Sequence, residues 1–502
     1  MGSRASIALV VTLIAALATG CTRRNDGYCC TDGALCDDVG GVLQACTTAG
    51  TMCDDTGALD GTPHTCVADP NASDCNGPDD CNPTNPVCLD HVCVPCDADA
   101  DCPTEAEPRC DRASHRCTGC DGPDSCARFP DTLVCGDGGA CVACEEPAAP
   151  TESASCPVAT PVCSTADECR VCTDHRECGS GACDLGTGMC VPADAIAYVE
   201  EGASGGNVQC TRAAPCRRPS LGVAVAGVDR PFIVVAAGDY TDDVSIVDKD
   251  LTIIGYGASV TAASNGPAIS VASTDAHVAL YGLTVTSSPV GVSCTGAASS
   301  DVALTAVDVT VEMSGMLGMA LTHCDLVMTR SRVSSNNDGG ISLTQGSNFD
   351  ITNSIIDGNG GPGEAFGGIR IETPRTTAVR LAFNTIADNT SSTTSGSFFP
   401  GIRCESTSTL PAFHSNIVTG NHGGSGDVQV GGSTGCGYEY SLVNPAIGGA
   451  TNVTGNPGFT TTYHLTTGSP AVDKGKPDSG VLEDYDAQLR PPDVPDIGAD
   501  EL

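Results

Sequence analysis

The chain has 502 residues, of which 33 are cysteine, none is tryptophan and 4% are aromatic. This length exceeds a single typical core and predicts at least two domains, or one domain with a repeat array. Acidic residues outnumber basic ones 62 to 23, and the formal net charge of −39 repels phosphate backbones, so we expect no nucleic-acid partner.

The first 20 residues have the composition of a secretory signal. A single early charge, Arg4, precedes an apolar run that is too short to span a bilayer. The run ends in Ala18-Thr19-Gly20-Cys21, which resembles the lipobox of bacterial lipoproteins, where the cysteine is acylated and becomes the new N-terminus. We expect residues 1–20 to be a lipoprotein signal peptide and Cys21 to be the lipidation site. The alternative is ordinary cleavage that releases a soluble protein.

The cysteine count agrees with lipidation. An odd number of cysteines in an exported protein leaves one thiol unpaired, and acylation of Cys21 leaves an even number for disulfides. No later apolar segment is long enough to cross a membrane. We therefore expect an outer-membrane or cell-surface lipoprotein that contacts the membrane through its N-terminal lipid only.

Residues 21–194 hold 27 of the 33 cysteines and form a repeat region. From Cys75 the cysteines recur in units of four, and a C-x-x-C such as Cys93/Cys96 joins one unit to the next. Units this poor in apolar side chains cannot bury a core and need covalent staples. Zinc would need reduced thiolates, whereas an exported chain meets an oxidising compartment, so we predict disulfides, no metal site and a stalk. The spacing leaves the connectivity open.

The acidic turns of this region raise the question of calcium, above all in the segment Asp97-Ala98-Asp99-Ala100-Asp101. An EF-hand loop beginning at Asp97 would need Gly at its sixth position and Glu at its twelfth, where Cys102 and Pro108 stand. We expect no obligate cofactor, and Ca²⁺ stays an optional ligand.

Residues 195–440 change to short β-branched runs separated by Gly, Asn or Asp turns, which indicate strands. Examples are Phe232–Val235, Val244–Val247 and Leu251–Ile254, with one short helix expected from Pro219 through Ala226. Later a Val/Ile-x-x-Asn turn and a Gly-Val/Ile strand recur every 23 to 32 residues, too far apart for a hairpin meander. The turns contain Asn336, Asn359, Asn389 and Asn421, which we expect to stack as a hydrogen-bonded ladder.

The six late cysteines fit stacked coils. Cys294 and Cys324, like Cys404 and Cys436, are about one coil apart, and adjacent coils are close enough for a disulfide. Cys210 and Cys216 would close a small loop near the N-terminal cap.

These features together resemble the right-handed parallel β-helix proteins of the pectate-lyase-like superfamily. The fold class predicted is all-β, a right-handed parallel β-helix (solenoid) preceded by a small disulfide-rich repeat region. Residues 441–502, with Ser469-Pro470-Ala471-x-Asp473-x-Gly475, Arg490-Pro491 and Asp496-Ile497-Gly498-Ala499-x-Glu501, resemble the choice-of-anchor Q domain that closes bacterial surface β-helices. We expect this tail to cover the last coil, a sheet edge that otherwise invites aggregation.

The superfamily includes polysaccharide lyases and hydrolases, but their motifs are incomplete here. The nearest match to a lyase Arg-x-Pro-x-x-Arg motif is the segment around Arg370, in which Glu372 stands where the motif has Arg. Arg370, Glu372 and Arg403 recur at equivalent strand positions and are the only catalytic candidates. The alternative is a charged strand face that keeps the coils soluble and in register.

Two functions follow. The first is a non-catalytic cell-surface module for adhesion or for binding a polysaccharide or another cell-surface or matrix component. The second, resting on fold analogy alone, is a surface polysaccharide lyase or glycoside hydrolase acting on an acidic polysaccharide.

Overall fold

The computed structural model describes residues 51–54, 65–68, 75, 78–90, 92–136, 138–145, 149–392, 399–423 and 428–502. The predicted signal peptide and Cys21 lie outside these residues. The chain divides into two compact units, of which the second comprises residues 158–161 and Val171–Leu502. None of the helices within the described ranges has the length and apolar character that a membrane crossing requires.

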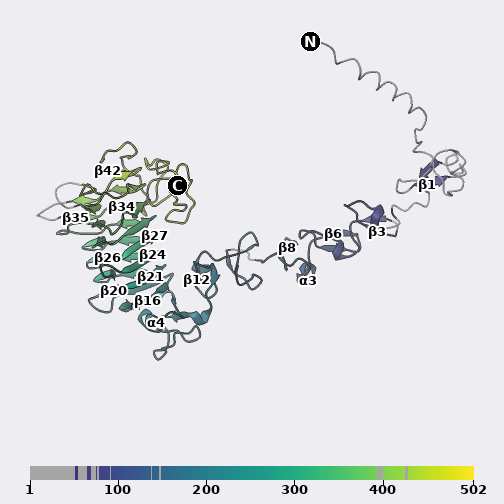
Figure 1. Cartoon of the computed structure of the whole chain (residues 1–502), viewed down its shortest axis with the longest axis horizontal. Helices are drawn as coiled ribbons and strands as arrows, with labels where there is room; N and C mark the ends of the chain where they lie inside the picture. The colour runs from purple at the N-terminus through teal and green to yellow at the C-terminus, as the bar shows by residue number, and fades with distance from the viewer. Residues whose placement is uncertain are drawn as a thin grey trace, which may run out of the picture. The chain divides into compact units, whose positions relative to one another are not determined.

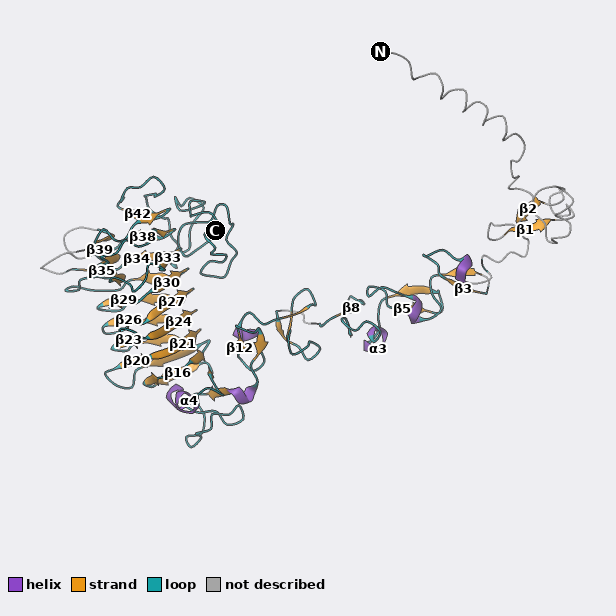
Figure 2. Ribbon diagram, in the orientation of Figure 1, coloured by secondary structure: helices purple, strands orange, loops and turns teal. Residues whose placement is uncertain are grey.

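The cysteine-rich region consists of small antiparallel sheets, one for each repeat unit (Figure 2). Their strands, in pairing groups, are β1 (Thr51–Asp54) and β2 (Thr65–Ala68); β3 (Val87–Leu89) and β4 (Val92–Val94); β5 (Arg109–Asp111) and β6 (Arg116–Thr118); β7 (Val134–Cys135) and β8 (Cys141–Val142); β9 (Thr151–Glu152), β10 (Val162–Cys163) and β11 (Cys169–Arg170); β12 (Cys183–Asp184) and β13 (Met189–Cys190). Among the described residues the region also contains the helix α3 (Pro123–Cys126) and single 3₁₀ turns at Pro78–Asp80, Asp99–Asp101, His175–Glu177 and Ala193–Ala195.

Each described repeat unit is closed by two disulfides with the same connectivity: the first cysteine pairs with the third, and the second with the fourth. The pairs are Cys75–Cys88 and Cys81–Cys93; Cys96–Cys110 and Cys102–Cys117; Cys120–Cys135 and Cys126–Cys141; Cys144–Cys163 and Cys156–Cys169; Cys172–Cys183 and Cys178–Cys190. Because the half-cystines are the main buried side chains of these units, the covalent bonds replace a hydrophobic core.

From Ile196 the chain winds through three parallel sheets (Figure 1). The ten-stranded sheet contains β14 (Ile196–Val199), β15 (Phe232–Val235), β18 (Leu251–Ile254), β21 (Asp275–Tyr281), β24 (Asp301–Val307), β27 (Asp325–Thr329), β30 (Phe349–Thr352), β33 (Arg380–Ala382), β37 (Phe413–His414) and β41 (Tyr438–Glu439). The nine-stranded sheet contains β16 (Gly238–Thr241), β19 (Ala258–Thr261), β22 (Thr284–Thr286), β25 (Thr310–Glu312), β28 (Arg332–Ser334), β31 (Ile355–Asp357), β34 (Thr385–Ala387), β38 (Ile417–Thr419) and β42 (Leu442–Asn444). The eight-stranded sheet contains β17 (Val244–Val247), β20 (Pro267–Ala272), β23 (Val290–Thr295), β26 (Leu317–Thr322), β29 (Gly339–Thr344), β32 (Ile369–Ile371), β36 (Ile402–Cys404) and β40 (Val430–Gly432).

From β15 to β34 every third strand returns to the same sheet, one coil further along, so the predicted parallel β-helix is confirmed. The expected short helix is α4 (Pro219–Val225), at the N-terminal end of the stack (Figure 1). Two short strands, β35 (Thr390–Ser391) and β39 (His422–Gly423), pair beside the three sheets.

In each recurrent Gly-Val/Ile pair the second residue points into the core, and the glycine before it has no room for a side chain. Ile341, Ile369 and Ile402 lie in register on successive coils and are fully buried. A Cβ on the preceding Gly368 or Gly401 would lie only 2.4 or 2.3 Å from a carbonyl oxygen of the next coil. Glycine is therefore required where the coil turns into the eight-stranded sheet.

The predicted asparagine ladder is confirmed at the corner between the nine- and eight-stranded sheets. The side-chain Nδ2 of each residue donates to the side-chain Oδ1 of the next. The distances are 2.7 Å from Asn336 to Asn359, 2.9 Å from Asn359 to Asn389 and 2.8 Å from Asn389 to Asn421. All four side chains are buried, so the ladder satisfies polar groups that the turn would otherwise leave unpaired.

The C-terminal segment covers more than the last coil. Val453 pairs with Leu442 of β42, the last strand of the nine-stranded sheet, as expected for a segment that covers the sheet edge. Beyond it the segment packs on the outside of the nine-stranded sheet, where Leu465, Ala471 and Ile497 bury the outward side chain of Ile417. The apolar residues on this outward face are thus explained by the segment that covers them.

The last cysteine repeat packs with the β-helix. The hydroxyl of Tyr198 donates to the carbonyl oxygen of Ser180 at 3.0 Å, and Ala182 and Val191 share a hydrophobic cluster with Tyr198 and Ile254. The second compact unit therefore includes this last repeat, from Val171 onward, because the repeat covers its apolar side chains with the first coils.

Candidate functional site

The three catalytic candidates come together on the outer face of the eight-stranded sheet. Arg370 on β32 and Arg403 on β36 are direct register partners on successive coils. Glu372 lies two residues after Arg370 on the same face, and its Oε1 accepts a hydrogen bond from Arg370 Nη2 at 2.7 Å. Arg370 and Arg403 therefore lie side by side because they are one coil apart in the sequence.

A fourth residue, Glu405, completes the cluster and was missed by the sequence analysis. Its Oε2 lies 2.7 Å from Arg370 Nε and its Oε1 lies 2.6 Å from Arg403 Nη2. Glu405 stands two residues after Arg403, as Glu372 stands two residues after Arg370, so the repeated Arg-x-Glu spacing was a signal that could have identified it. We call Arg370, Glu372, Arg403 and Glu405 the Arg-Glu cluster.

The electrostatics of the Arg-Glu cluster favour ionised, fully engaged side chains. Burial acts to raise the pKa of Glu405, but hydrogen bonds and charges from Arg370 and Arg403 outweigh it and lower that pKa. Glu372 also accepts a hydrogen bond from the backbone N–H of Gln345 at 2.8 Å. Two positive and two negative charges compensate each other, and the lowered pKa of Glu405 is the opposite of the raised pKa typical of a general acid.

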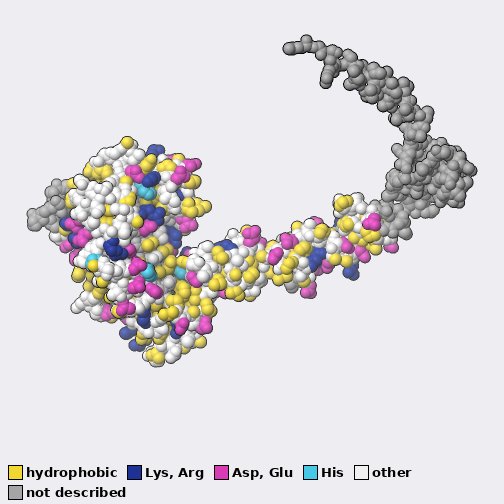
Figure 3. Space-filling view, in the orientation of Figure 1, with side chains coloured by type: hydrophobic (Ala, Val, Ile, Leu, Met, Phe, Trp, Pro, Cys, Tyr) yellow, Lys and Arg dark blue, Asp and Glu magenta, His cyan; other side chains and the backbone are white. Residues whose placement is uncertain are grey.

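Other charged residues on the β-helix are paired in the same way. Arg380 makes a two-pronged contact with Asp350, at 2.7 and 2.8 Å, on the ten-stranded sheet. Arg332 contacts Asp357 with both distances at 2.8 Å on the nine-stranded sheet. Figure 3 shows basic side chains interspersed with acidic ones over the face of the β-helix in view. These pairs join neighbouring coils and stabilise their register.

The N-terminal coils of the eight-stranded sheet carry hydroxyl groups where the later coils carry the Arg-Glu cluster. Ser245, Ser270 and Ser293 are register partners in one outward column, which continues through Ala320 and Ser342 to Arg370. Thr295, Thr322 and Thr344 form a second column on the same face. The outer face of this sheet is thus uncharged along its first part and charge-balanced along its later part.

The late cysteines join the pairs that their spacing suggested. Cys210 pairs with Cys216, and the bonds Cys294–Cys324 and Cys404–Cys436 link adjacent coils with Cα atoms 5.9 and 6.2 Å apart. These disulfides cross-link the coils and supply no reactive thiol.

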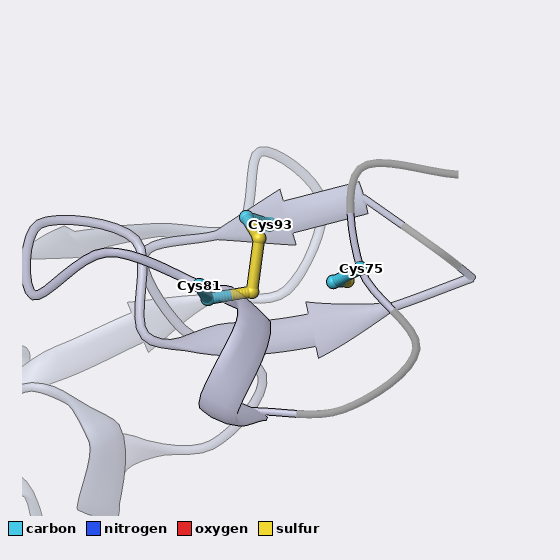
Figure 4. A group of neighbouring side chains, drawn as sticks. All are labelled: Cys75, Cys81 and Cys93. Carbon is cyan, nitrogen blue, oxygen red and sulfur yellow. A yellow bond between two sulfur atoms is a disulfide. The ribbon is translucent and has the colours of Figure 1, made fainter. Parts of the chain in front are cut away.

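The cysteine repeats bring three sulfur atoms together in each described unit, as a zinc site would. In Figure 4, Cys75 lies beside the bonded pair Cys81 and Cys93, and the three sulfur atoms lie within 4.8 Å of one another. Cys75 is itself bonded to Cys88. A disulfide sulfur is not a thiolate, so the oxidised units lack the ligands that zinc requires.

The acidic segment considered for calcium uses its carboxylates on its own backbone. Asp101 Oδ2 accepts the backbone N–H groups of Asp97 and Ala98, both at 2.9 Å, and Asp99 Oδ1 accepts that of Cys110 at 2.8 Å. These carboxylates stabilise a turn of the repeat, which accounts for the acidic spacing without an ion.

Comparison with known proteins supports the fold. Residues 267–445 match the family described as "Right handed beta helix region", and residues 104–196 match a family of unknown function, DUF8331. No curated protein matches the chain.

The solved structures that are similar to the chain include two enzymes. The first is a deglycosylated pectin methylesterase from Aspergillus niger, with 12% identity over 53% of this chain and 86% of that chain and a TM-score of 0.34. The second is pectate lyase Pel9A, with 13% identity over 61% of this chain and 96% of that chain and a TM-score of 0.29. The family match and the three stacked parallel sheets identify a right-handed parallel β-helix in the second half of the chain.

Proposed function

We propose that this chain is an exported surface protein whose β-helix binds a polysaccharide or another cell-surface or matrix component without cleaving it. The observation that carries the proposal is the closed pairing in the Arg-Glu cluster. Arg370 and Arg403 are held by Glu372 and Glu405 at 2.6 to 2.7 Å, so the only residues with a catalytic pattern already have partners.

The surroundings of the Arg-Glu cluster support binding rather than cleavage. The first coils of the same sheet face present a column of serine hydroxyls, Ser245, Ser270 and Ser293, at the regular spacing of stacked coils. Hydroxyl groups on a rigid sheet can hydrogen-bond a polymer that is itself rich in hydroxyls. The disulfides among the described cysteines are typical of proteins that work outside the cytoplasm.

The anchor belongs to the same proposal. A lipid on Cys21 would hold the chain at a membrane surface, and the disulfide-closed repeats would connect that lipid to the β-helix. Lipid anchoring and an outer-membrane location rest on the sequence Ala18-Thr19-Gly20-Cys21 alone.

Purified full-length chain incubated with neutral and acidic polysaccharides, with and without Ca²⁺, tests the proposal. We expect retention of at least one polymer on the protein and no new reducing or unsaturated ends. New ends that disappear in an Arg370→Gln variant would overturn the proposal in favour of a lyase or hydrolase. Failure to bind any polymer or cell surface would remove its basis.

A further inference from the structure

The last cysteine repeat packs on the outer face of the ten-stranded sheet with a histidine at the contact. The ring of His175 makes an edge-to-face contact with the ring of Tyr281, the last residue of β21, with centroids 4.3 Å apart. His175 is only 2% exposed. Next to it, the guanidinium carbon of Arg176 lies 4.7 Å from the centroid of the Tyr256 ring. The turn around His175 is therefore part of the surface that joins the repeat to the coils.

The hydrogen bonding of His175 requires a neutral ring. The backbone N–H of Cys183 donates to His175 Nδ1 at 3.1 Å, so this nitrogen is an acceptor and the ring proton lies on Nε2. Nε2 is buried and has no hydrogen-bond partner among the described residues. A second proton would have to enter at Nδ1, where it would face the N–H of Cys183 and end that hydrogen bond.

Within the repeat, the carboxylates next to His175 are engaged elsewhere. Asp174 is bound by the side chain of Arg176 at 2.8 Å and accepts the backbone N–H of Arg176 at 2.7 Å. Glu177 Oε2 accepts the backbone N–H of Thr173 at 2.8 Å. Burial lowers the pKa of His175, although the charge of Asp174 opposes this shift. The repeat thus favours the uncharged ring.

On the β-helix side, the titratable groups around the His175 turn are two tyrosines and one ion pair. Burial raises the pKa of Tyr256 and of Tyr281, so both phenols stay neutral. Asp308 and Arg330, whose charges act on these tyrosines, pair with each other at 2.9 Å. A protonated His175 would therefore be a buried charge without a carboxylate of its own, which is costly.

The apolar part of the contact is small. Among the described residues of the repeat, Ala182 and Val191 are buried in the apolar cluster shared with the coils. The hydroxyl of Tyr198 adds one hydrogen bond to the repeat, and a cavity of about 260 Å³ is lined by both His175 and Tyr256. Because few groups hold the repeat in place, a change in one of them can shift the balance between docked and released states.

We propose that this contact is an acid-sensitive joint: protonation of His175 releases the last cysteine repeat from the ten-stranded sheet, while the coils of the β-helix stay folded. The docked repeat binds fewer protons than the released one, so release is favoured as the pH falls. The released repeat is still closed by its two disulfides. The turn Ala193–Ala195, which links the repeat to β14, then becomes a hinge.

A single tryptophan at Tyr256 reports on the joint. The chain contains no tryptophan, so Tyr256→Trp would introduce the only indole, and the cavity beside this residue leaves room for it. We would follow its emission and its quenching by acrylamide in the full chain from about pH 8 to about pH 4.5, with far-UV circular dichroism of the same samples. We expect a reversible red shift and at least about a twofold rise in the quenching constant, at constant circular dichroism. The midpoint should lie below pH 6.5, because burial lowers the pKa of His175.

Substitutions of His175 that do not titrate, made in the Tyr256→Trp protein, identify the group responsible. His175→Asn keeps an oxygen that can accept the N–H of Cys183 and cannot be protonated near neutral pH. His175→Phe is the second variant, because it keeps a ring against Tyr281. The acid transition should be absent from these variants.

The matched controls are two other histidines. His277→Phe, at a mostly exposed side chain, and His414→Phe, at a buried one outside the joint, should both keep the transition. No change in the indole emission of Tyr256→Trp over this pH range would overturn the proposal. The same midpoint in the His175 variants would also overturn it, as would a loss of circular dichroism that coincides with the emission change. None of these outcomes bears on glycan binding, because the joint requires no ligand.

Discussion

The guanidinium carbon of Arg490 lies 4.5 Å from the centroid of the Phe383 ring, which joins the C-terminal segment to the β-helix. Arg490 is almost completely buried, and its Nη1 lies 2.9 Å from Glu501 Oε2. Its Nη2 donates to the carbonyl oxygens of Gly498 and Ala499, both at 2.9 Å. A single side chain therefore joins the last residues of the tail to the coil beneath them.

Replacement of Arg490 by Leu should destabilise the protein strongly. The change leaves the Glu501 carboxylate buried without its partner and removes the stack on Phe383, with an expected loss of about 3–5 kcal/mol in the free energy of unfolding. Urea unfolding followed by circular dichroism measures it. Lys476→Gln is the control, since the Lys476–Glu439 pair is half-exposed and should contribute at most about 1 kcal/mol. Similar losses in both variants would contradict the central role of Arg490.

The asparagine ladder should be sensitive at its middle. Asn359→Ala removes the acceptor of Asn336 and the donors to Asn389 and to the carbonyl oxygen of Val333, all buried. Each unsatisfied buried group costs about 1–3 kcal/mol, so we expect a loss of at least about 3 kcal/mol. Asn265→Ala, in an exposed turn, should change the unfolding free energy by less than about 0.5 kcal/mol.

The Arg-Glu cluster should affect stability and its pH dependence. The pKa of Glu405 is lower in the folded protein than in the unfolded chain, so its ionised form stabilises the fold at pH values above its pKa in the unfolded chain. This contribution is lost as the pH falls through the pKa of Glu405 in the folded protein. A double-mutant cycle with Arg370→Met and Glu405→Gln should give a coupling of about 1 kcal/mol near pH 7. A coupling that does not decrease on acidification would contradict the ionised pairing.

His414 should make the β-helix less stable in mild acid. Burial, assisted by the positive charge of Lys476 and of Arg380 against the opposing charge of Glu439, lowers the pKa of His414 to about 4. Between pH 6.5 and that value the unfolded chain binds more protons, so stability falls as the pH falls. At about pH 5 the loss should approach about 2 kcal/mol relative to about pH 7.5.

The variant His414→Phe should remove this part of the pH dependence in urea titrations at the two pH values. His277→Phe is the matched control, because the His277 side chain is mostly exposed. An unchanged pH dependence in His414→Phe would show that His414 does not titrate abnormally.

Acylation of Cys21 predicts a definite thiol count. Unreduced, denatured mature protein should react with no equivalent of maleimide, since the remaining cysteines are even in number. Cys21→Ala should abolish incorporation of labelled fatty acid and release the protein from membranes. One reactive thiol in the wild-type protein, or a membrane-bound Cys21→Ala variant, would contradict the lipid anchor.

The sequence by itself determined the β-helix and much of its internal order. Stacked coils repeat, so the residues that must face inward, turn or pair recur at the coil period: Ile341 with Ile369, Gly368 with Gly401, Asn359 with Asn389. The same period placed Arg370 beside Arg403 and Cys404 near Cys436. In a repeat fold, residues one repeat apart in the sequence contact each other, so the repeat read from the sequence predicts these contacts directly.

Only the tertiary structure decided the contacts that do not follow the period. The disulfide connectivity of the cysteine units depends on how each hairpin folds, and spacing alone allows several pairings. The burial of Arg490 against Phe383 joins residues more than a hundred positions apart, and the packing of the tail on Ile417 depends on which outward faces stay uncovered.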